Sequence, residues 1–401
     1  MERETPYLLA INAGSSSIRF SVYQTASPQH RGLNGKVDRI GLLGTTMTFN
    51  DPVRKAQESR VLGQLDHGSA ASFLIDWLEE RMGLASLLAV GHRIVNGGAN
   101  RRAPQRVTLE LLDELRRISA YAPEHLPFEI ELIDLLRARV PVLPQVVCFD
   151  TAFHRDMPRV AKIIPIPRRF YAKGIERYGF HGLSYSFLME ELARVAGPQA
   201  AQARVILAHL GNGASLAAVR DGNCIDTSMG LTPAAGVPMS TRSGDLDPGL
   251  IGYLAQTENM TAEQFHRMVN HESGLLGVSE TSSDLRDLLD REGQDVRAAE
   301  AVALFCYQVK KWIGAYAAVL GGLDTLVFAG GIGENAPVIR ARICAGLDFL
   351  GIKLDQATNE RSEPVISIGE SRVTVRVIPT DEEAMIAKTV LQLMVQGSDA
   401  R

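Results

Sequence analysis

The sequence has few cysteines, no excess of positive charge and no apolar run long enough to cross a membrane. The four cysteines form no CxxC pair and have no histidine at metal-ligand spacing, so they are expected to be buried thiols in a reducing compartment: Cys148, Cys224, Cys306 and Cys344. Forty-two basic against 46 acidic residues give a net charge of −4. With no positive field to attract them, neither nucleic acid nor an anionic membrane is an expected partner, and small-molecule chemistry is favoured.

Membrane and export signals are also missing. The longest apolar stretch, residues 312–323, is interrupted by Gly321-Gly322 and ends at Asp324, well short of the roughly 20 residues of a membrane span. It predicts a buried helix that ends at a glycine turn. The N-terminus lacks the charge order and apolar length of a signal peptide, and we expect a cytoplasmic protein.

Length and an internal repeat predict two domains. A chain of 401 residues with 45% hydrophobic residues is long enough for two cores. Residues 7–23 alternate as a hairpin with a polar tip, and residues 204–219 repeat the same pattern about half a chain later. The repeat predicts two similar α/β halves with a boundary near Asp150.

Apolar periodicity predicts the main elements. Helical spacing appears at 69–82, 109–117, 183–196, 298–320, 338–345 and 383–395, and strand-like runs at 87–90, 145–149, 325–328 and 373–378. Residues 150–182 look loop-like. Two polar segments, 26–32 and 356–364, are weak candidates for linkers.

Three small-residue turns are candidates for phosphate binding, because backbone N–H groups in such turns can point at one anion. They are Asn12-Ala-Gly-Ser-Ser-Ser17, His209-Leu-Gly-Asn-Gly213 and Ala329-Gly-Gly-Ile-Gly-Glu-Asn335. The glycines of the third do not follow GxGxxG spacing, which favours a nucleotide site without a dinucleotide-binding fold. An ordinary tight turn remains the alternative for each.

Two acids and two arginines stand where strands are expected to end. Asp150 and Glu382 could hold a hard cation bound to nucleotide phosphates, although a helix cap or surface acid explains either alone. Arg93 and Arg242 are flanked by glycines and could hold a carboxylate or phosphate through two N–H groups, with a salt bridge as the alternative. His125 and His181 could equally be core histidines.

Together these segments resemble the acetate kinase family, within the superfamily of actin, sugar kinases and the Hsp70 ATPase domain. Separate motifs agree in order and spacing from Leu8 to near Ala387: INAGSSS, GHR, FDTAFH, GFHG, HLGNG with TRSGDLDPG, and AGGIGEN. The resemblance implies an α/β fold of two actin-like, ribonuclease H-like ββαβαβα domains with an ATP cleft between them. The domains would span 1–150, joined by a C-terminal helix at 383–401, and 151–382, usually in a homodimer.

The resemblance also implies roles for single residues. Arg93, His125, Asp150, His181 and Arg242 would be catalytic, and Arg93, Val95, Phe180 and Pro233 would bind the acid. Asn12, Asp150 and Glu382 would hold Mg²⁺, or Mn²⁺. ATP would be bound by Asn12, Ser17, Arg19, His209, Leu210, Gly211, Asn212, Gly213, Asp284, Leu285, Arg286, Gly331, Ile332, Gly333, Glu334 and Asn335.

The implied reaction is the reversible, Mg²⁺-dependent transfer of the ATP γ-phosphoryl group to acetate, giving acetyl phosphate and ADP. A carboxylate is already ionised at pH 7, which is why the site needs donors and cations rather than a general base. Propionate or another short-chain acid is the alternative acceptor. A non-enzymatic ATP-binding switch has no use for Arg93, Arg242 and His181 together.

Several residues depart from the family pattern. Arg19 stands for a usual Lys, Asn96 for His, Ser240 and Glu280 for Gly, and Glu124 and Leu126 for the Leu and Asn around His125. We expect Glu124 to face the acid's methyl end and to weaken binding of simple acids. The alternative is that the loop shifts, Glu124 reaches solvent and Leu126 supplies the wall.

Overall fold

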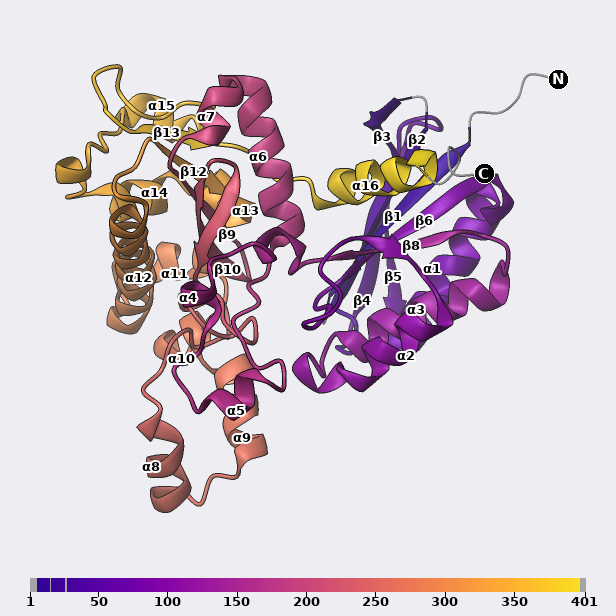
Figure 1. The fold of residues 1–401 in the computed structure, drawn as a ribbon, viewed down its shortest axis with the longest axis horizontal. Helices are drawn as coiled ribbons and strands as arrows, with labels where there is room; N and C mark the ends of the chain where they lie inside the picture. Colours follow the sequence, from indigo (N-terminus) through magenta and orange to yellow (C-terminus); the bar gives the residue numbers. More distant parts are fainter. Residues whose placement is uncertain (1–5, 15, 26, 397–401) are drawn as a thin grey trace. The chain divides into compact units, whose positions relative to one another are not determined.

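Two α/β units, each with its own sheet, form the protein in this computed structural model, which describes residues 6–14, 16–25 and 27–396 (Figure 1). Unit 1 comprises the chain up to residue 152 and from residue 381 onward, and unit 2 comprises residues 153–380. Both sheets mix parallel and antiparallel strands.

Unit 1 has an eight-stranded sheet in the order β5-β4-β3-β2-β1-β6-β8-β7. Its strands are β1 (Tyr7–Ala13), β2 (Ser17–Gln24), β3 (Ser27–Asp38), β4 (Thr45–Asp51), β5 (Ala56–Gly63), β6 (Leu87–Ile94), β7 (Gln105–Arg106) and β8 (Gln145–Phe149). Its helices are α1 (His67–Met82), α2 (Leu109–Arg117), α3 (Leu126–Arg139) and α16 (Glu382–Gln396).

Alternation along the strands gives the sheet of unit 1 two different faces. Phe20 and Phe49 point to one face and pack on Trp77 of α1, with ring centroids 5.7 and 4.8 Å away. Helix α16 packs on β1 and β6 (Figure 1). It comes so close at Gly91 that an added Cβ would lie 2.4 Å from the Ile386 side chain, so only glycine fits there.

Unit 2 has a five-stranded sheet in the order β11-β10-β9-β12-β13. Its strands are β9 (Val205–Leu210), β10 (Ala214–Arg220), β11 (Asn223–Thr227), β12 (Thr325–Ala329) and β13 (Thr374–Val377). Its helices are α4 (Arg159–Lys162), α5 (Arg168–Tyr171), α6 (Gly182–Ala196), α7 (Pro198–Gln202), α8 (Gly249–Thr257), α9 (Ala262–Arg267), α10 (Gly274–Ser279), α11 (Leu285–Arg291), α12 (Val296–Leu320), α13 (Gly330–Asn335), α14 (Pro337–Cys344) and α15 (Gln356–Glu360).

Most predicted elements are confirmed within one or two residues, including the two hairpins. The predicted buried helix is α12, which ends at Gly321 in a left-handed conformation with φ 71°. The linker predictions were wrong: β3 begins at Ser27 and α15 at Gln356, because short polar segments there are fixed by pairing and by an Asp355 cap. The unit 1 sheet is also wider than predicted, since β4, β5 and β7 extend its edges.

The cysteines and the apolar helices can be compared with what the sequence predicts. The four cysteines are buried free thiols, as predicted. Among the residues that the structure describes, no helix is long and apolar enough to cross a membrane.

Candidate functional site

In unit 1, parallel strands bring Arg93 and Asp150 to one edge of the sheet. β6 pairs in parallel with β1 and β8, and Arg93 lies opposite Cys148. The amide of Asp150 continues this ladder by donating to the Ile94 carbonyl at 2.9 Å. The Arg93 side chain donates from Nη2 to Asp150 Oδ2 at 2.9 Å and from Nη1 to the Ala13 carbonyl at 3.1 Å.

Arg93 also contacts Glu129 of α3. The distance from Arg93 Nη1 to Glu129 Oε1 is 3.4 Å, and Glu129 Oε2 accepts the Val95 N–H at 3.0 Å. Burial alone would lower the pKa of Arg93, but Asp150, Glu129 and Glu382 together raise it. Burial raises the pKa of Glu129 to about 8, although Arg93 and the Val95 N–H favour its charged form.

Asn12 connects the first phosphate turn to the start of α16. Its Nδ2 donates to Glu382 Oε2 at 2.7 Å and to Glu383 Oε1 at 3.1 Å. Burial raises the pKa of Glu382, and the negative charge of nearby Asp150 raises it further. Burial and then Glu382 raise the pKa of Glu383 in the same way.

This donor set fits a hard divalent cation. Within the described ranges, no three His, Cys, Asp or Glu side chains form a complete metal site. Mg²⁺ needs no such site, because it is usually held by one or two carboxylates with water and substrate phosphates completing its shell. Asp150 is fully buried and Glu382 is half-buried, and a cation would relieve the repulsion between their two negative charges.

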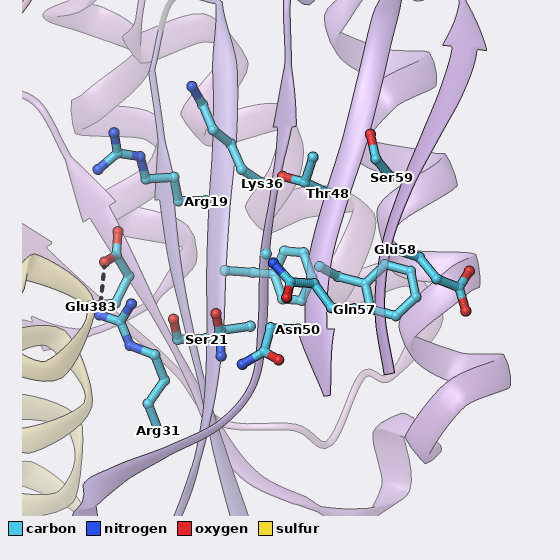
Figure 2. Close-up of a pocket in the computed structure, with 14 residues that line it drawn as sticks. Arg19, Ser21, Arg31, Lys36, Thr48, Asn50, Gln57, Glu58, Ser59 and Glu383 are labelled. Carbon is cyan, nitrogen blue, oxygen red and sulfur yellow. Dashed lines mark ion pairs between the residues drawn. The ribbon is translucent and has the colours of Figure 1, made fainter. Parts of the chain in front are cut away.

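Arg19 and Ser17 lie on β2, directly after the first turn. Ser17 is half-buried, and Arg19, which pairs across the sheet with Asn12, is exposed. Arg19 and Lys36 of β3 line a groove of about 600 Å³. Figure 2 shows these side chains together with the ion pair of Glu383 and Arg31, whose N–O distance is 3.5 Å. Burial is the main cause of the raised pKa values of Glu382 and Glu383, and the positive charge of Arg19 opposes it.

His125, Val95, Glu124 and Leu126 are the remaining unit 1 predictions. His125 is buried and precedes the first turn of α3, and Leu126 and Val95 are also buried. Glu124 is half-buried. Arg101, a cation that could partner Glu124, pairs with Glu114 at 2.6 Å.

In unit 2, His181 occupies a left-handed backbone conformation, φ 58°, immediately before α6. Such a conformation is uncommon for a residue other than glycine and persists where the surroundings hold it. His181 Nδ1 lies 2.8 Å from Ser215 Oγ, which also hydrogen-bonds Tyr185. The Ser215 contact fixes the orientation of the ring, so that Nε2 lies on the side of Gly213.

His181, His209 and Arg242 gather around the second turn. The rings of His181 and His209 stack with centroids 4.3 Å apart. A Cβ added to Gly213 would lie 3.2 Å from His181 Nε2 and 3.4 Å from Arg242 Nη1. His209 Nδ1 lies 2.8 Å from Ser184 Oγ of α6. The glycine keeps a space open in front of a guanidinium and an imidazole.

The second and third turns lie at one edge of the unit 2 sheet. β9 and β12 are parallel and end together, with Ala329 opposite His209. An added Cβ on Gly330, φ 75°, would lie 2.7 Å from the Leu210 carbonyl. Glu334 Oε1 accepts the N–H groups of Gly330 and Thr380 at 2.9 and 3.1 Å, so this predicted nucleotide residue also holds the turn itself.

The remaining residues of the predicted nucleotide set also lie in unit 2. Leu210 is buried at the end of β9; Gly211 and Asn212 belong to the turn that follows; Gly331, Ile332, Gly333 and Asn335 form α13. Asp284 caps α11 and, with Leu285 and Arg286, stands apart in sequence from both turns. Arg286 pairs with Asp284 at 2.5 Å and is largely exposed.

The predicted acid-binding residues are divided between the two units. Val95 belongs to unit 1 and Phe180 and Pro233 to unit 2. Phe180 is buried, and its carbonyl accepts from His154 Nε2 at 2.9 Å. Pro233 is half-buried, and its carbonyl accepts from Arg242 Nη1 at 3.4 Å.

Two departures from the family pattern have local explanations. Glu280 stands for glycine at a position with φ 57°, and it pairs with Arg297 at 2.6 Å. Asn96 is fully buried and accepts the Gly98 N–H at 2.8 Å, which shapes the turn after β6.

Sequence reasoning missed Glu129, Glu383 and Ser215. A signal for Glu129 was available, since it lies three residues after Leu126 and four before Ile133 on the buried stripe of α3. A carboxylate at such a position needs a partner inside the protein. Ser215 gave no comparable signal, because a small residue in a buried strand is ordinary.

The chain is similar to known acetate and propionate kinases. The acetokinase family model matches residues 7–388. The chain is 42% identical to a propionate kinase of Citrobacter rodentium over 96% of both chains, and 41% identical to an acetate kinase of Rhodopseudomonas palustris over 97% of this chain and 99% of that one. An acetate kinase structure from Porphyromonas gingivalis aligns with a TM-score of 0.87 at 36% identity, covering 97% of this chain and all of that one. A propionate kinase structure from Francisella tularensis aligns with a TM-score of 0.89 at 35% identity over 96% and 98%.

The chain is thus a phosphotransferase with a carboxyl group as acceptor. It belongs to the acetokinase family, the family of acetate and propionate kinases, and its fold is that of acetate kinase. Family membership implies ATP as co-substrate and a short-chain carboxylate as acceptor.

Proposed function

We propose that this protein is an acetate kinase, which transfers the γ-phosphoryl group of ATP reversibly to acetate with Mg²⁺. The observation that carries this proposal is the pairing of Arg93 with buried carboxylates at the edge where Asn12, Asp150 and Glu382 meet. A cation of fixed charge beside a metal-binding carboxylate suits an anionic acceptor that must approach nucleotide phosphates.

The proposed roles in unit 1 follow from these contacts. Asp150 and Glu382, with Asn12 in support, hold Mg²⁺, which neutralises charge on the nucleotide phosphates when bound. Arg93 holds the carboxylate of the acid, with Val95 beside it. Arg19 and Ser17 add donors to the phosphates, and His125 fixes the loop before α3 near the acid.

In unit 2, the turns carry the nucleotide and the side chains act on the moving group. Backbone N–H groups of the second and third turns bind phosphates, and residues 284–286 bind the rest of ATP. Arg242 and His181 Nε2 donate to the phosphoryl oxygens as charge collects on them in a loose transition state. Phe180 and Pro233 are the apolar residues of unit 2 that we assign to binding of the acid.

Propionate is the second candidate acceptor, because propionate kinases are as similar to this chain as acetate kinases are. The two acids differ by one methylene, worth roughly 1 kcal/mol in an apolar pocket. The homodimer implied by the family resemblance also stays a proposal, which light scattering coupled to size-exclusion chromatography tests.

The test is acyl phosphate formation. Purified protein is incubated with ATP, Mg²⁺ and one acid from a series from formate to butyrate, and the product is trapped with hydroxylamine as the hydroxamate. We expect hydroxamate with acetate and propionate, the higher kcat/KM with acetate, and loss of the signal when Mg²⁺ is omitted. ATP turnover that no carboxylate stimulates would refute the kinase proposal, whereas a preference for propionate would replace the acceptor only.

A further inference from the structure

Glu129 joins two residues of the proposed acid site through one buried carboxylate. Its Oε1 lies 3.4 Å from Arg93 Nη1, and its Oε2 accepts the Val95 N–H at 3.0 Å. The side chain of Glu129 is 1% exposed, and that of Arg93 13%. We propose that Glu129 is a positioning residue that fixes the Arg93 guanidinium and the Val95 backbone for the incoming carboxylate, and so sets the affinity for the acid.

The backbone explains why an acceptor is needed at this point. β6 ends at Ile94, so the next N–H, that of Val95, leaves the sheet ladder while still buried. A buried N–H without an acceptor is costly, and Glu129 supplies one from α3. The same carboxylate then has its second oxygen directed at Arg93.

The guanidinium is thereby held from two sides. Asp150 Oδ2 accepts from Nη2 at 2.9 Å, and Glu129 with the Ala13 carbonyl engages Nη1. A planar group with acceptors on both terminal nitrogens cannot rotate without breaking charged hydrogen bonds. Without Glu129, Arg93 would keep its charge but lose one of the contacts that define its plane.

The placement of Glu129 argues against a role in packing alone. The other inward positions of α3 are apolar, among them Leu126, Ile130 and Ile133. A buried carboxylate in this stripe destabilises the fold relative to an apolar side chain unless its contacts compensate. Its two contacts go to the two unit 1 residues assigned to the acid.

The test compares Glu129→Gln with Glu131→Gln, an exposed position on the same helix. Glutamine matches the shape of Glu129 but offers one acceptor oxygen for two donors. In hydroxamate assays on the full chain, we expect Glu129→Gln to raise the KM for acetate and propionate about tenfold or more, with the KM for ATP changed less than about twofold. Glu131→Gln should match the wild type in every constant.

A double-mutant cycle separates positioning from stability. If Glu129 acts through Arg93, Glu129→Gln should add little to the KM for the acid in an Arg93→Lys background, whereas independent effects would multiply. A lower melting temperature with an unchanged KM for the acid would overturn the inference. If Glu129→Gln does not fold, Glu129→Asp, which keeps the carboxyl group but is one methylene shorter, is measured instead with the same two outcomes.

This inference rests on the proposed function, and the two can fail separately. Wild-type protein that forms no acyl phosphate from any acid would refute the function and the inference together. Active wild-type protein with an unchanged KM in the variant would refute the inference alone.

Discussion

The two units build their candidate sites at the same place in the fold but with different chemistry. In unit 1, Asp150 follows the end of a buried strand, and helices α3 and α16 add Glu129 and Glu382 around Arg93. In unit 2, α6 adds hydroxyl and imidazole groups beside glycine turns. Both sites lie at the C-terminal ends of parallel strands. The difference in their chemistry therefore arises from the residues on the helices that pack near those strand ends.

The comparison suggests a division of labour. Carboxylates beside one arginine suit a metal and an anionic acceptor, while the Arg242 guanidinium, imidazole and hydroxyl groups and glycine backbone N–H groups suit phosphate oxygens. The four predictions below test this division, from the largest expected effect to the smallest.

The first prediction removes one charged group from each unit. Asp150→Asn and Arg242→Ala should each lower kcat by roughly 10²-fold or more, the loss typical of one electrostatic stabiliser of a transition state. If the division is correct, Asp150→Asn should also raise the Mg²⁺ concentration needed for half-maximal rate, and Arg242→Ala should not. Steady-state kinetics with Mg²⁺ titration measures both effects.

Circular dichroism spectra that match the wild type provide the control for folding. A wild-type kcat in either variant would show that the role assigned to that residue is wrong. If both variants depend equally on Mg²⁺, the proposed division of roles between the units is wrong, but the kinase proposal still holds.

The second prediction concerns acid stability of unit 1. His92 is buried; its Nε2–H donates to Gln145 Oε1 at 2.6 Å, and its Nδ1 has no hydrogen-bond partner. Burial lowers the pKa of His92 to about 4, below its unfolded value of about 6.5. The unfolded chain therefore binds the proton first, and stability is lost as pH falls from about 6.5 to 4, by up to about 3 kcal/mol.

The measurement is the melting temperature of wild type and His92→Gln between pH 4 and 8. Glutamine can still donate to Gln145 but cannot titrate. The difference between the two proteins should thus shrink or reverse as pH falls. A difference that stays constant across this range would show that His92 does not carry the pH dependence.

Much of this arrangement can be predicted from the sequence because it depends on patterns within short segments of the chain. The hairpins, the glycine turns and Asp150 after a buried strand follow from apolar alternation and small residues in short windows. Motif order then supplied the roles.

The contacts of Glu129 and Ser215 could not be obtained in this way. Glu129 meets Arg93 across 36 residues, and Ser215 meets His181 across 34. Such contacts depend on how a helix docks on a sheet, which local periodicity does not specify. The same limit explains the linker error at 26–32, where pairing with β2 makes a polar segment into strand.

The third prediction adds one methyl group to the unit 2 site. Gly213→Ala would place a Cβ 3.2 Å from His181 Nε2 and 3.4 Å from Arg242 Nη1, so one of these groups must shift by a few tenths of an ångström. We expect kcat to fall about tenfold, because small misplacements of positioned groups are costly. The control is Gly314→Ala within α12, where an added Cβ meets nothing within 4 Å.

Alanine at Gly314 should leave kcat unchanged and raise the melting temperature, since alanine is favoured over glycine by about 1 kcal/mol inside a helix. A Gly213→Ala variant with wild-type kcat would show that the space in front of His181 and Arg242 is not used in the reaction.

The last prediction concerns Glu124, whose half-buried side chain lies directly before the buried His125 and α3. If Glu124 faces the acid, its charge repels a second carboxylate. For unit charges ~4 Å apart this costs about 1 kcal/mol in bulk water and about 4 kcal/mol at an effective dielectric of 20, and solvent beside a half-buried side chain keeps the cost near the lower figure. Glu124→Leu should then lower the KM for acetate several-fold and leave kcat nearly unchanged. Hydroxamate kinetics with acetate and propionate measure this, with Glu131→Leu on the exposed face of α3 as control.

Leu126 offers a competing explanation that the same experiment resolves. It is fully buried at the first turn of α3, where it can supply the apolar wall while Glu124 reaches solvent. In that case replacing Glu124 removes no repulsion, and the KM for both acids stays at the wild-type value. A lower KM in Glu124→Leu alone would instead mark Glu124 as a residue that weakens simple acids, and would favour an acceptor other than acetate for the native pocket.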